Sequence, residues 1–92
     1  MSRHVSRKER WTRVDAKRHQ SDLGEVVYQQ NGWYAVLAYR TLSAPEEGAL
    51  LAWDHHVRRL GPFKRPRNAM VALEQEANVL KNRHGDNLVF GD

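Results

Sequence analysis

The residues with the clearest chemistry are three cations grouped around a proline. Residues 60–69 read LGPFKRPRNA, with Lys64 and Arg65 before Pro66 and Arg67 after it. Pro66 suits the first turn of a helix, but a helix start carries partial positive charge and favours acidic side chains. A phosphate group would accept the free backbone N–H groups there and pair with the cations. The stretch therefore predicts an anion site, and the alternative is that water caps the helix while the side chains point outward.

Positive charge is concentrated in two blocks of a chain whose net charge is +4. Residues 1–24 hold seven Lys and Arg against three acids, and residues 58–67 hold five Lys and Arg with no acid. Two basic blocks favour a phosphate-bearing partner, whereas the alternative is that they only keep the protein soluble. The predicted phosphate contacts are Arg58, Arg59, Lys64, Arg65 and Arg67, aided by Arg7, Lys8, Arg10, Arg13, Lys17 and Arg18.

A second candidate surface is one face of the segment that contains Tyr34 and Arg40. Aromatic rings and guanidinium groups on a sheet stack on bases or contact the nucleic-acid backbone. We therefore assign Tyr34 and Arg40 to base or sugar contact, with Gln29 and Arg58 beside them. The alternative is that this face is partly covered or forms a dimer surface.

The histidines and their neighbours do not indicate catalysis or metal binding. His55 and His56 are adjacent, so on a strand they face opposite sides and do not converge on one ion. Asp54 precedes His55, but no serine or cysteine nucleophile motif accompanies the pair. The chain has no cysteine and no glycine-rich phosphate loop. We expect no enzyme activity, no catalytic residue, no cofactor and no metal.

The candidate side chains need a sheet to position them, and residues 24–41, GEVVYQQNGWYAVLAYRT, predict a hairpin over 25–41. Asn31-Gly32 between two β-rich runs favours a type I′ turn, because both turn positions need positive φ. The cross-strand pairs would then be Gln30 with Trp33, Tyr28 with Ala35, and Val26 with Leu37. The predicted core face carries Val26, Tyr28, Trp33, Leu37 and Tyr39.

Residues 42–60, LSAPEEGALLAWDHHVRRL, fit two structures. In a helix over 44–60, Ser43 would be the N-cap and Glu46 would complete a capping box. The apolar residues that recur at helical spacing are Leu50, Trp53, Val57 and Leu60. Because a hairpin alone is marginally stable, we predict instead a third strand within 49–60 and keep the helix as the alternative.

A helix is predicted from Pro66 to about residue 82. Its buried stripe is Met70, Leu73, Ala77 and Leu80, joined by Ala69 and Val71. Gly85 follows a basic last turn and suits the C-terminal cap. The tail 86–92 contains Leu88, Val89 and Phe90, which can dock as a short strand.

The whole chain has 92 residues, of which 40% are apolar, and predicts one small α+β domain over 24–92. Residues 1–23 are expected to form a basic N-terminal arm or a frayed helix around 6–19. The N-terminus has no apolar core of a secretory signal, and no apolar run is long enough to span a membrane. We therefore expect a cytoplasmic protein without a membrane partner.

The segment from Val26 to Ala77 resembles small DNA-binding domains built from a three-stranded sheet and a helix. Examples are the amino-terminal arm-binding domain of tyrosine recombinases and the plant ethylene-response-factor domain. The resemblance rests on GWYAVLAYR, followed by RRLGPF and then ALEQEA in the helix. It implies a sheet that enters the major groove of DNA. The long apolar connection over 42–52, Pro62 and Pro66 depart from that pattern.

Two functions follow as expectations. The first is a small basic nucleic-acid-binding protein, with DNA favoured over RNA. The alternative is a protein-interaction module such as an adaptor, an inhibitor or a homodimer, with no role in nucleic-acid binding. This alternative rests on apolar residues expected at the surface, which are Trp11, Leu50, Leu51 and the tail 88–90.

Overall fold

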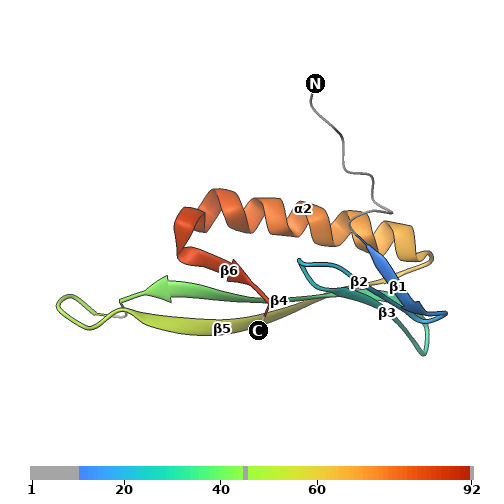
Figure 1. Ribbon diagram of the computed structural model, residues 1–92, viewed down its shortest axis with the longest axis horizontal. Coiled ribbons are helices and arrows are strands. Elements are labelled where there is room, and N and C mark those ends of the chain that lie inside the picture. Colours follow the sequence, from blue (N-terminus) through green and yellow to red (C-terminus); the bar gives the residue numbers. More distant parts are fainter. Residues whose placement is uncertain (1–10, 45, 92) are drawn as a thin grey trace, which may run out of the picture.

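Strands and one long helix make up the part of the chain that the structure, a computed structural model, describes: residues 11–44 and 46–91. In chain order the elements are β1 (Thr12–Asp15), β2 (Arg18–Gln20), β3 (Glu25–Gln29), β4 (Gly32–Ser43), β5 (Ala52–Phe63), α2 (Pro66–His84), a 3-10 turn η1 (Gly85–Asn87) and β6 (Leu88–Phe90). The strands form one antiparallel sheet and α2 packs on it (Figure 1), so the predicted α+β fold is confirmed.

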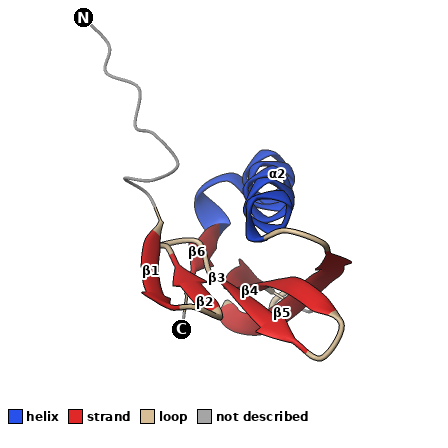
Figure 2. Cartoon of the chain, turned by 90° about the vertical axis from the view of Figure 1, so that its right-hand side faces the viewer, coloured by secondary structure: helices blue, strands red, loops and turns tan. Residues whose placement is uncertain are grey.

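The long strand β4 organises the sheet because it pairs along both of its edges. β5 follows one edge from Trp33 to Ser43. On the other edge, β3 pairs with the first half of β4 and β6 pairs with the second half. β1 and β2 extend the sheet beyond β3. Figure 2 shows α2 lying over one face of this sheet, with no described helix on the other face.

Alternation along β4 selects the face that α2 covers. Ala35, Leu37, Tyr39 and Thr41 are buried, and the residues between them are only half-buried. Successive side chains of a strand point to opposite faces, so this period of two separates a covered side from an open one. The predicted core face is confirmed for Val26, Leu37 and Tyr39; Trp33 packs against the core, but Tyr28 is exposed.

The helix α2 meets this face with the residues that its periodicity predicts. Its buried residues are Ala69, Met70, Leu73, Ala77 and Leu80, whereas Val71 is only half-buried. Gly85 caps the helix with φ 58°, and its N–H donates to the Lys81 carbonyl oxygen. The predicted helix, its start at Pro66, its glycine cap and the short strand β6 are therefore confirmed.

The register predicted for the first hairpin is wrong, although its faces are right. Gln29 pairs with Gly32 and Tyr28 with Trp33, so the turn is formed by Gln30 and Asn31. Gln30 takes the positive φ of 29°. Gly32 is needed for a different reason, because a Cβ on it would lie 2.9 Å from the Phe63 carbonyl oxygen. The position of the turn is therefore fixed by the packing of Gly32 against the end of β5. The local sequence does not reveal this contact.

The predicted third strand is confirmed as β5, and the alternative helix over 44–60 is wrong. β5 begins at Ala52 and extends beyond the predicted range, because its pairing continues to Phe63. The apolar spacing that suggested a helix does not mark a buried stripe: Leu50 is 89% exposed and Val57 is 72% exposed. Backbone pairing along the whole of β4 outweighs the local helical pattern.

The helix predicted around residues 6–19 is also wrong in its described part, because residues 12–20 form the strands β1 and β2. The carboxylate of Asp15 accepts from the Lys17 N–H at 2.7 Å and closes their turn. Trp11 is buried, and its Nε1–H donates to Glu74 of α2 at 3.0 Å. The side chains of β1 are exposed, so its sequence shows little hydrophobic alternation. Backbone pairing with β2 and the buried Trp11 hold this strand in place instead. Residues 1–10 of the predicted arm lie outside the described residues.

The position of the turn gives a test of the hairpin. We expect Gly32→Ala to lower the free energy of unfolding by about 1–3 kcal/mol, because the added Cβ meets the backbone of Phe63. Gln30→Gly is expected to be neutral or stabilising by up to about 1 kcal/mol, since glycine accepts positive φ. Urea unfolding of both variants measures this. A tolerated Gly32→Ala together with a destabilising Gln30→Gly would contradict the described register.

Candidate nucleic-acid interface

The connection between β5 and α2 leaves the start of the helix without a side-chain cap. Arg65 occupies the N-cap position in an extended conformation and makes no capping hydrogen bond, and the first turn contains no acid. Pro66 has no N–H of its own, but the next backbone N–H groups of the first turn have no partner within the helix. These donors and the helix dipole together favour a negatively charged group at this point.

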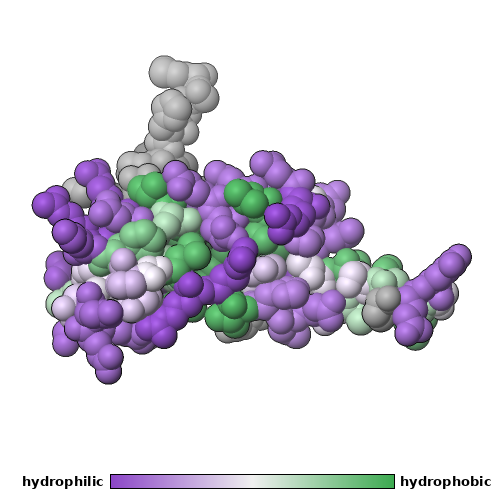
Figure 3. All heavy atoms as spheres, turned by 180° about the vertical axis from the view of Figure 1, so that it is seen from behind, coloured by the Kyte–Doolittle hydropathy of each residue, from purple (hydrophilic) through white to green (hydrophobic). Residues whose placement is uncertain are grey.

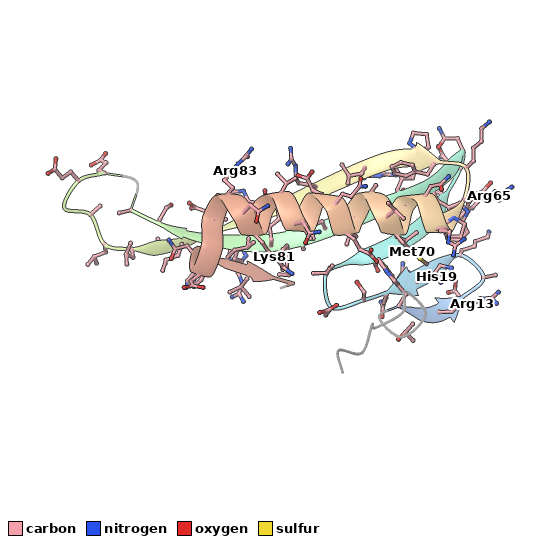
Figure 4. All side chains as sticks on the ribbon, turned by 90° about the horizontal axis from the view of Figure 1, so that it is seen from above. Arg13, His19, Arg65, Met70, Lys81 and Arg83 are labelled. Carbon is pink, nitrogen blue, oxygen red and sulfur yellow. The ribbon has the colours of Figure 1, made fainter. Side chains whose placement is uncertain are left out.

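Three predicted cations surround this helix start. Lys64, Arg65 and Arg67 are exposed, and none of them forms an ion pair with another residue in 11–44 or 46–91. In Figure 4, Arg65 lies at the same end of the molecule as Arg13 of β1. Lys17 occupies the turn that follows Arg13. We refer to Lys64, Arg65, Arg67, Arg13 and Lys17 as the basic end.

The opposite end of the molecule has a mixed charge. The tip between β4 and β5 carries the exposed acids Glu46 and Glu47, and Asp54 accepts from Ser43 Oγ at 3.1 Å. Lys81 and Arg83 lie in the last turn of α2 (Figure 4). The cations next to the start of α2, Lys64, Arg65 and Arg67, therefore have no acidic partner in the described chain, whereas Asp15 lies between Arg13 and Lys17 and acids are interspersed with cations at the other end.

The predicted pair Arg58 and Arg59 is divided between the two faces of the sheet. Arg58 pairs in register with Leu37, so it lies on the side of α2 and forms an ion pair with Glu76. Arg59 lies on the open side, where its guanidinium sits 4.0 Å from the ring centre of Tyr34 and donates to Gln29. Neighbours on a strand point to opposite faces, so only Arg59 remains available on the open side.

The other predicted residues are distributed as follows. Arg18 lies in β2 and is 3.8 Å from the carboxylate of Glu25. Arg40 lies on the open side of β4, with its guanidinium 5.7 Å from the ring centre of Trp53. Its Nε is buried and has no hydrogen-bond partner within the described chain. Arg7, Lys8 and Arg10 lie outside the described residues.

A polar hollow of about 490 Å³ lies beside the Arg59–Tyr34 pair. Its remaining lining comes from Gln29, Gln30 and Asn31, and the Tyr34 hydroxyl donates to Asn31 Oδ1 at 2.8 Å. Sequence reasoning named Tyr34 and Gln29 for this surface but missed that Arg59 stacks on Tyr34. The β4–β5 register would have revealed it, because Arg59 pairs with Val36, two residues from Tyr34.

The histidines of β5 face opposite sides, as expected. His56 stacks on Tyr39 at 4.8 Å and lies 2.9 Å from Thr41 Oγ1, on the side of α2. His55 pairs with Arg40 on the open side. Among residues 11–44 and 46–91 there is no group of three or more His, Asp or Glu side chains placed to hold a metal ion.

Comparison with known proteins gives no relative: no family model, no curated protein and no solved structure matches this chain. The resemblance to sheet-and-helix DNA-binding domains therefore stays a prediction. No helix within residues 11–44 and 46–91 is both long enough and apolar enough to cross a membrane.

The pKa of His19 depends on the charged groups next to the basic end. Its ring lies 5.6 Å from that of Trp33, and desolvation lowers its pKa below the ordinary value of 6.5. The positive charge of Arg13 lowers this pKa further, and Asp15 opposes it. Because the folded-state pKa is depressed, the contribution of neutral His19 to stability is complete above about pH 6.5 and is lost as the pH falls through the folded-state pKa.

An NMR titration of the His19 ring tests this electrostatic arrangement. Arg13→Gln is expected to raise the His19 pKa, because it removes a neighbouring positive charge, and Asp15→Asn is expected to lower it further. Arg83→Gln, at the far end of α2, is the control and should leave this pKa unchanged. A His19 pKa above 6.5 in the unmodified protein would contradict the described surroundings.

Proposed function

We propose that this protein binds nucleic acid, with the basic end contacting backbone phosphates. The observation that carries the proposal is the uncapped start of α2, where Lys64, Arg65 and Arg67 are exposed without an acidic partner in the described chain. Cations at a helix start oppose the dipole and cost some stability, so their presence favours a functional role. A phosphate group satisfies the N–H groups, the dipole and the cations together.

The surroundings of the helix start support this proposal. Arg13 and Lys17 add positive charge from β1 and the following turn. The sequence directly before β1 contributes Arg7, Lys8 and Arg10 as further phosphate contacts. Arg58 makes a smaller contribution than the sequence predicted, because Glu76 already pairs with it. DNA is the polymer favoured first, since the resemblance at the sequence level is to DNA-binding domains.

The proposal predicts a binding affinity that depends steeply on salt. Neutralising phosphates releases counterions, so the logarithm of the association constant falls linearly with the logarithm of the salt concentration. Arg65→Gln with Arg67→Gln is expected to weaken binding to labelled DNA at least about tenfold and to reduce the slope by about two. Fluorescence anisotropy over a salt series measures both quantities.

A matched control removes the same charge from the other end of the same helix. Lys81→Gln with Arg83→Gln also takes away two positive charges, but in the last turn of α2. This variant should retain the slope and most of the affinity. Equal losses in the two double variants would mean that net charge alone drives binding, and an affinity that barely changes with salt would remove the phosphate mechanism.

A second candidate function, a protein-interaction module, is favoured by the tip between β4 and β5. Leu50 is 89% exposed and Leu51 is 66% exposed, and Trp53 follows them on β5. Figure 3 shows this tip projecting from the body, with apolar atoms beside hydrophilic ones. Exposed apolar side chains that lie together mark interaction sites on small proteins. The predicted surface role of Trp11 is wrong, because Trp11 is buried.

Light scattering after size exclusion tests the homodimer form of this second function. It predicts a mass of two chains at high protein concentration, which falls to one chain in the double variant Leu50→Ser, Leu51→Ser. Val79→Ser removes an exposed apolar side chain of α2 and should leave the mass unchanged. A single-chain mass for the unmodified protein at all concentrations would remove the homodimer.

A further inference from the structure

The face of the sheet opposite α2, here called the open face, carries an unusual combination of side chains. Alternation in β4 and β5 places on it Tyr34, Val36, Ala38, Arg40 and Leu42 together with Trp53, His55, Val57 and Arg59. Trp53 is 43% exposed, and no described helix covers this side (Figure 2). Arginine, aromatic and small apolar side chains thus share one accessible strand surface.

Two arginine–aromatic pairs stand at either end of this surface. Arg59 of β5 lies 4.0 Å from the ring centre of Tyr34 in β4, and Arg40 of β4 lies 5.7 Å from that of Trp53 in β5. Tyr34 and Arg40 are six residues apart in β4, and Trp53 and Arg59 are six residues apart in β5. At about 3.3 Å per residue, the two pairs are about 20 Å apart along the sheet. Each pair presents flat groups of the kind on which nucleobases stack.

The surface between the pairs is apolar and slightly hollow. Val36, Ala38 and Val57 line a hollow of about 380 Å³, whose side toward β3 carries two acids, Asp22 and Glu25. Arg18 is 3.8 Å from the Glu25 carboxylate and offsets its charge. A polyanion that follows β4 and β5 therefore passes over apolar side chains, with Asp22 and Glu25 to one side of its path.

Arg40 forms no ion pair within the described chain, and its buried Nε has no hydrogen-bond partner there. A guanidinium group especially favours phosphate or carboxylate, and an anion on the open face would meet its terminal N–H groups, because Nε itself is not accessible. Its position next to Trp53 combines a site for an anion with a ring for a base. A nucleotide offers both groups, whereas an apolar partner offers neither.

We propose that the open face binds an unpaired segment of nucleic acid along β4 and β5, with bases at the two arginine–aromatic pairs and a phosphate at Arg40. This inference rests on the proposed function and names its ligand as a single strand, because the faces of paired bases are covered in a duplex. A second copy of this chain fits less well, since stacking two open faces would bury Arg40 and Arg59 against their own copies.

Three labelled ligands at one salt concentration test the inference: a short oligothymidine, the same backbone with abasic sites, and a duplex of equal length. Base stacking should make the oligothymidine bind at least about fivefold more tightly than the abasic strand. Tyr34→Leu with Trp53→Leu should abolish this difference by lowering the affinity for the oligothymidine to that for the abasic strand. Tyr28→Leu is the control, because Tyr28 is an exposed tyrosine on the side of α2.

Tryptophan fluorescence of the unmodified protein gives a readout that does not depend on the folding of the double variant. Trp11 is buried and Trp33 lies on the side of α2, so oligothymidine should quench Trp53, and Trp53→Phe should remove the quenching. Equal binding of the base-bearing and abasic strands, or tighter binding of the duplex, would overturn the inference and leave the proposed function intact. Binding of none of the three ligands would overturn both. A dimer that Trp53→Leu converts to a monomer would also overturn the inference, because a second copy would then cover the open face.

Discussion

The packing of β4 against α2 is the interaction on which the rest of the structure depends. Leu37, Leu73 and Leu80 are fully buried in this contact, and burial of each such side chain contributes about 1.5–3 kcal/mol. Because β4 pairs along both edges, fixing its faces also fixes those of β3, β5 and β6. This contact therefore also places Arg58 on the side of α2 and Arg59 on the opposite side of the sheet. Gly24 keeps the connection into β3 close to the same layer, since a Cβ there would meet the Val36 carbonyl oxygen at 2.3 Å.

Because α2 covers one face of the sheet, polar and charged side chains have different surroundings on the two faces. On the covered side, polar groups find partners within the fold, as in the ion pair of Arg58 with Glu76 and the contact of Thr41 with His56. On the open side, Arg40 and Arg59 lie beside aromatic rings, and the Nε of Arg40 has no hydrogen-bond partner within the described chain. The basic end adjoins both sides, because the chain passes from β5 into α2 there. Lys64, Arg65 and Arg67 therefore lie together because α2 begins there.

Much of the fold could be predicted from the sequence, because its main elements carry local signals. Alternation in 32–41 indicates the face of β4, and the apolar stripe after Pro66 indicates α2. The predicted turn lies one residue too far along the chain, since Gly32 serves the contact with Phe63 and not the turn itself. β1 and β2 could not be predicted, because their stability comes from pairing with β3 and from Trp11. For the candidate site, the cations around α2 were identifiable, but the stacking of Arg59 on Tyr34 depends on the register of two strands.

The ribbon formed by β4 and β5 continues beyond the reach of the other strands. After Thr41, the described part of β4 pairs with β5 alone, and the two strands end at the partners Ser43 and Ala52. The segment that joins them lies outside the main core, so its length is largely independent of how the domain folds. A peptide epitope or a dye could be grafted between these two positions with little effect on α2 or the basic end. The molecule can therefore be immobilised through this segment, which leaves its charged surfaces accessible.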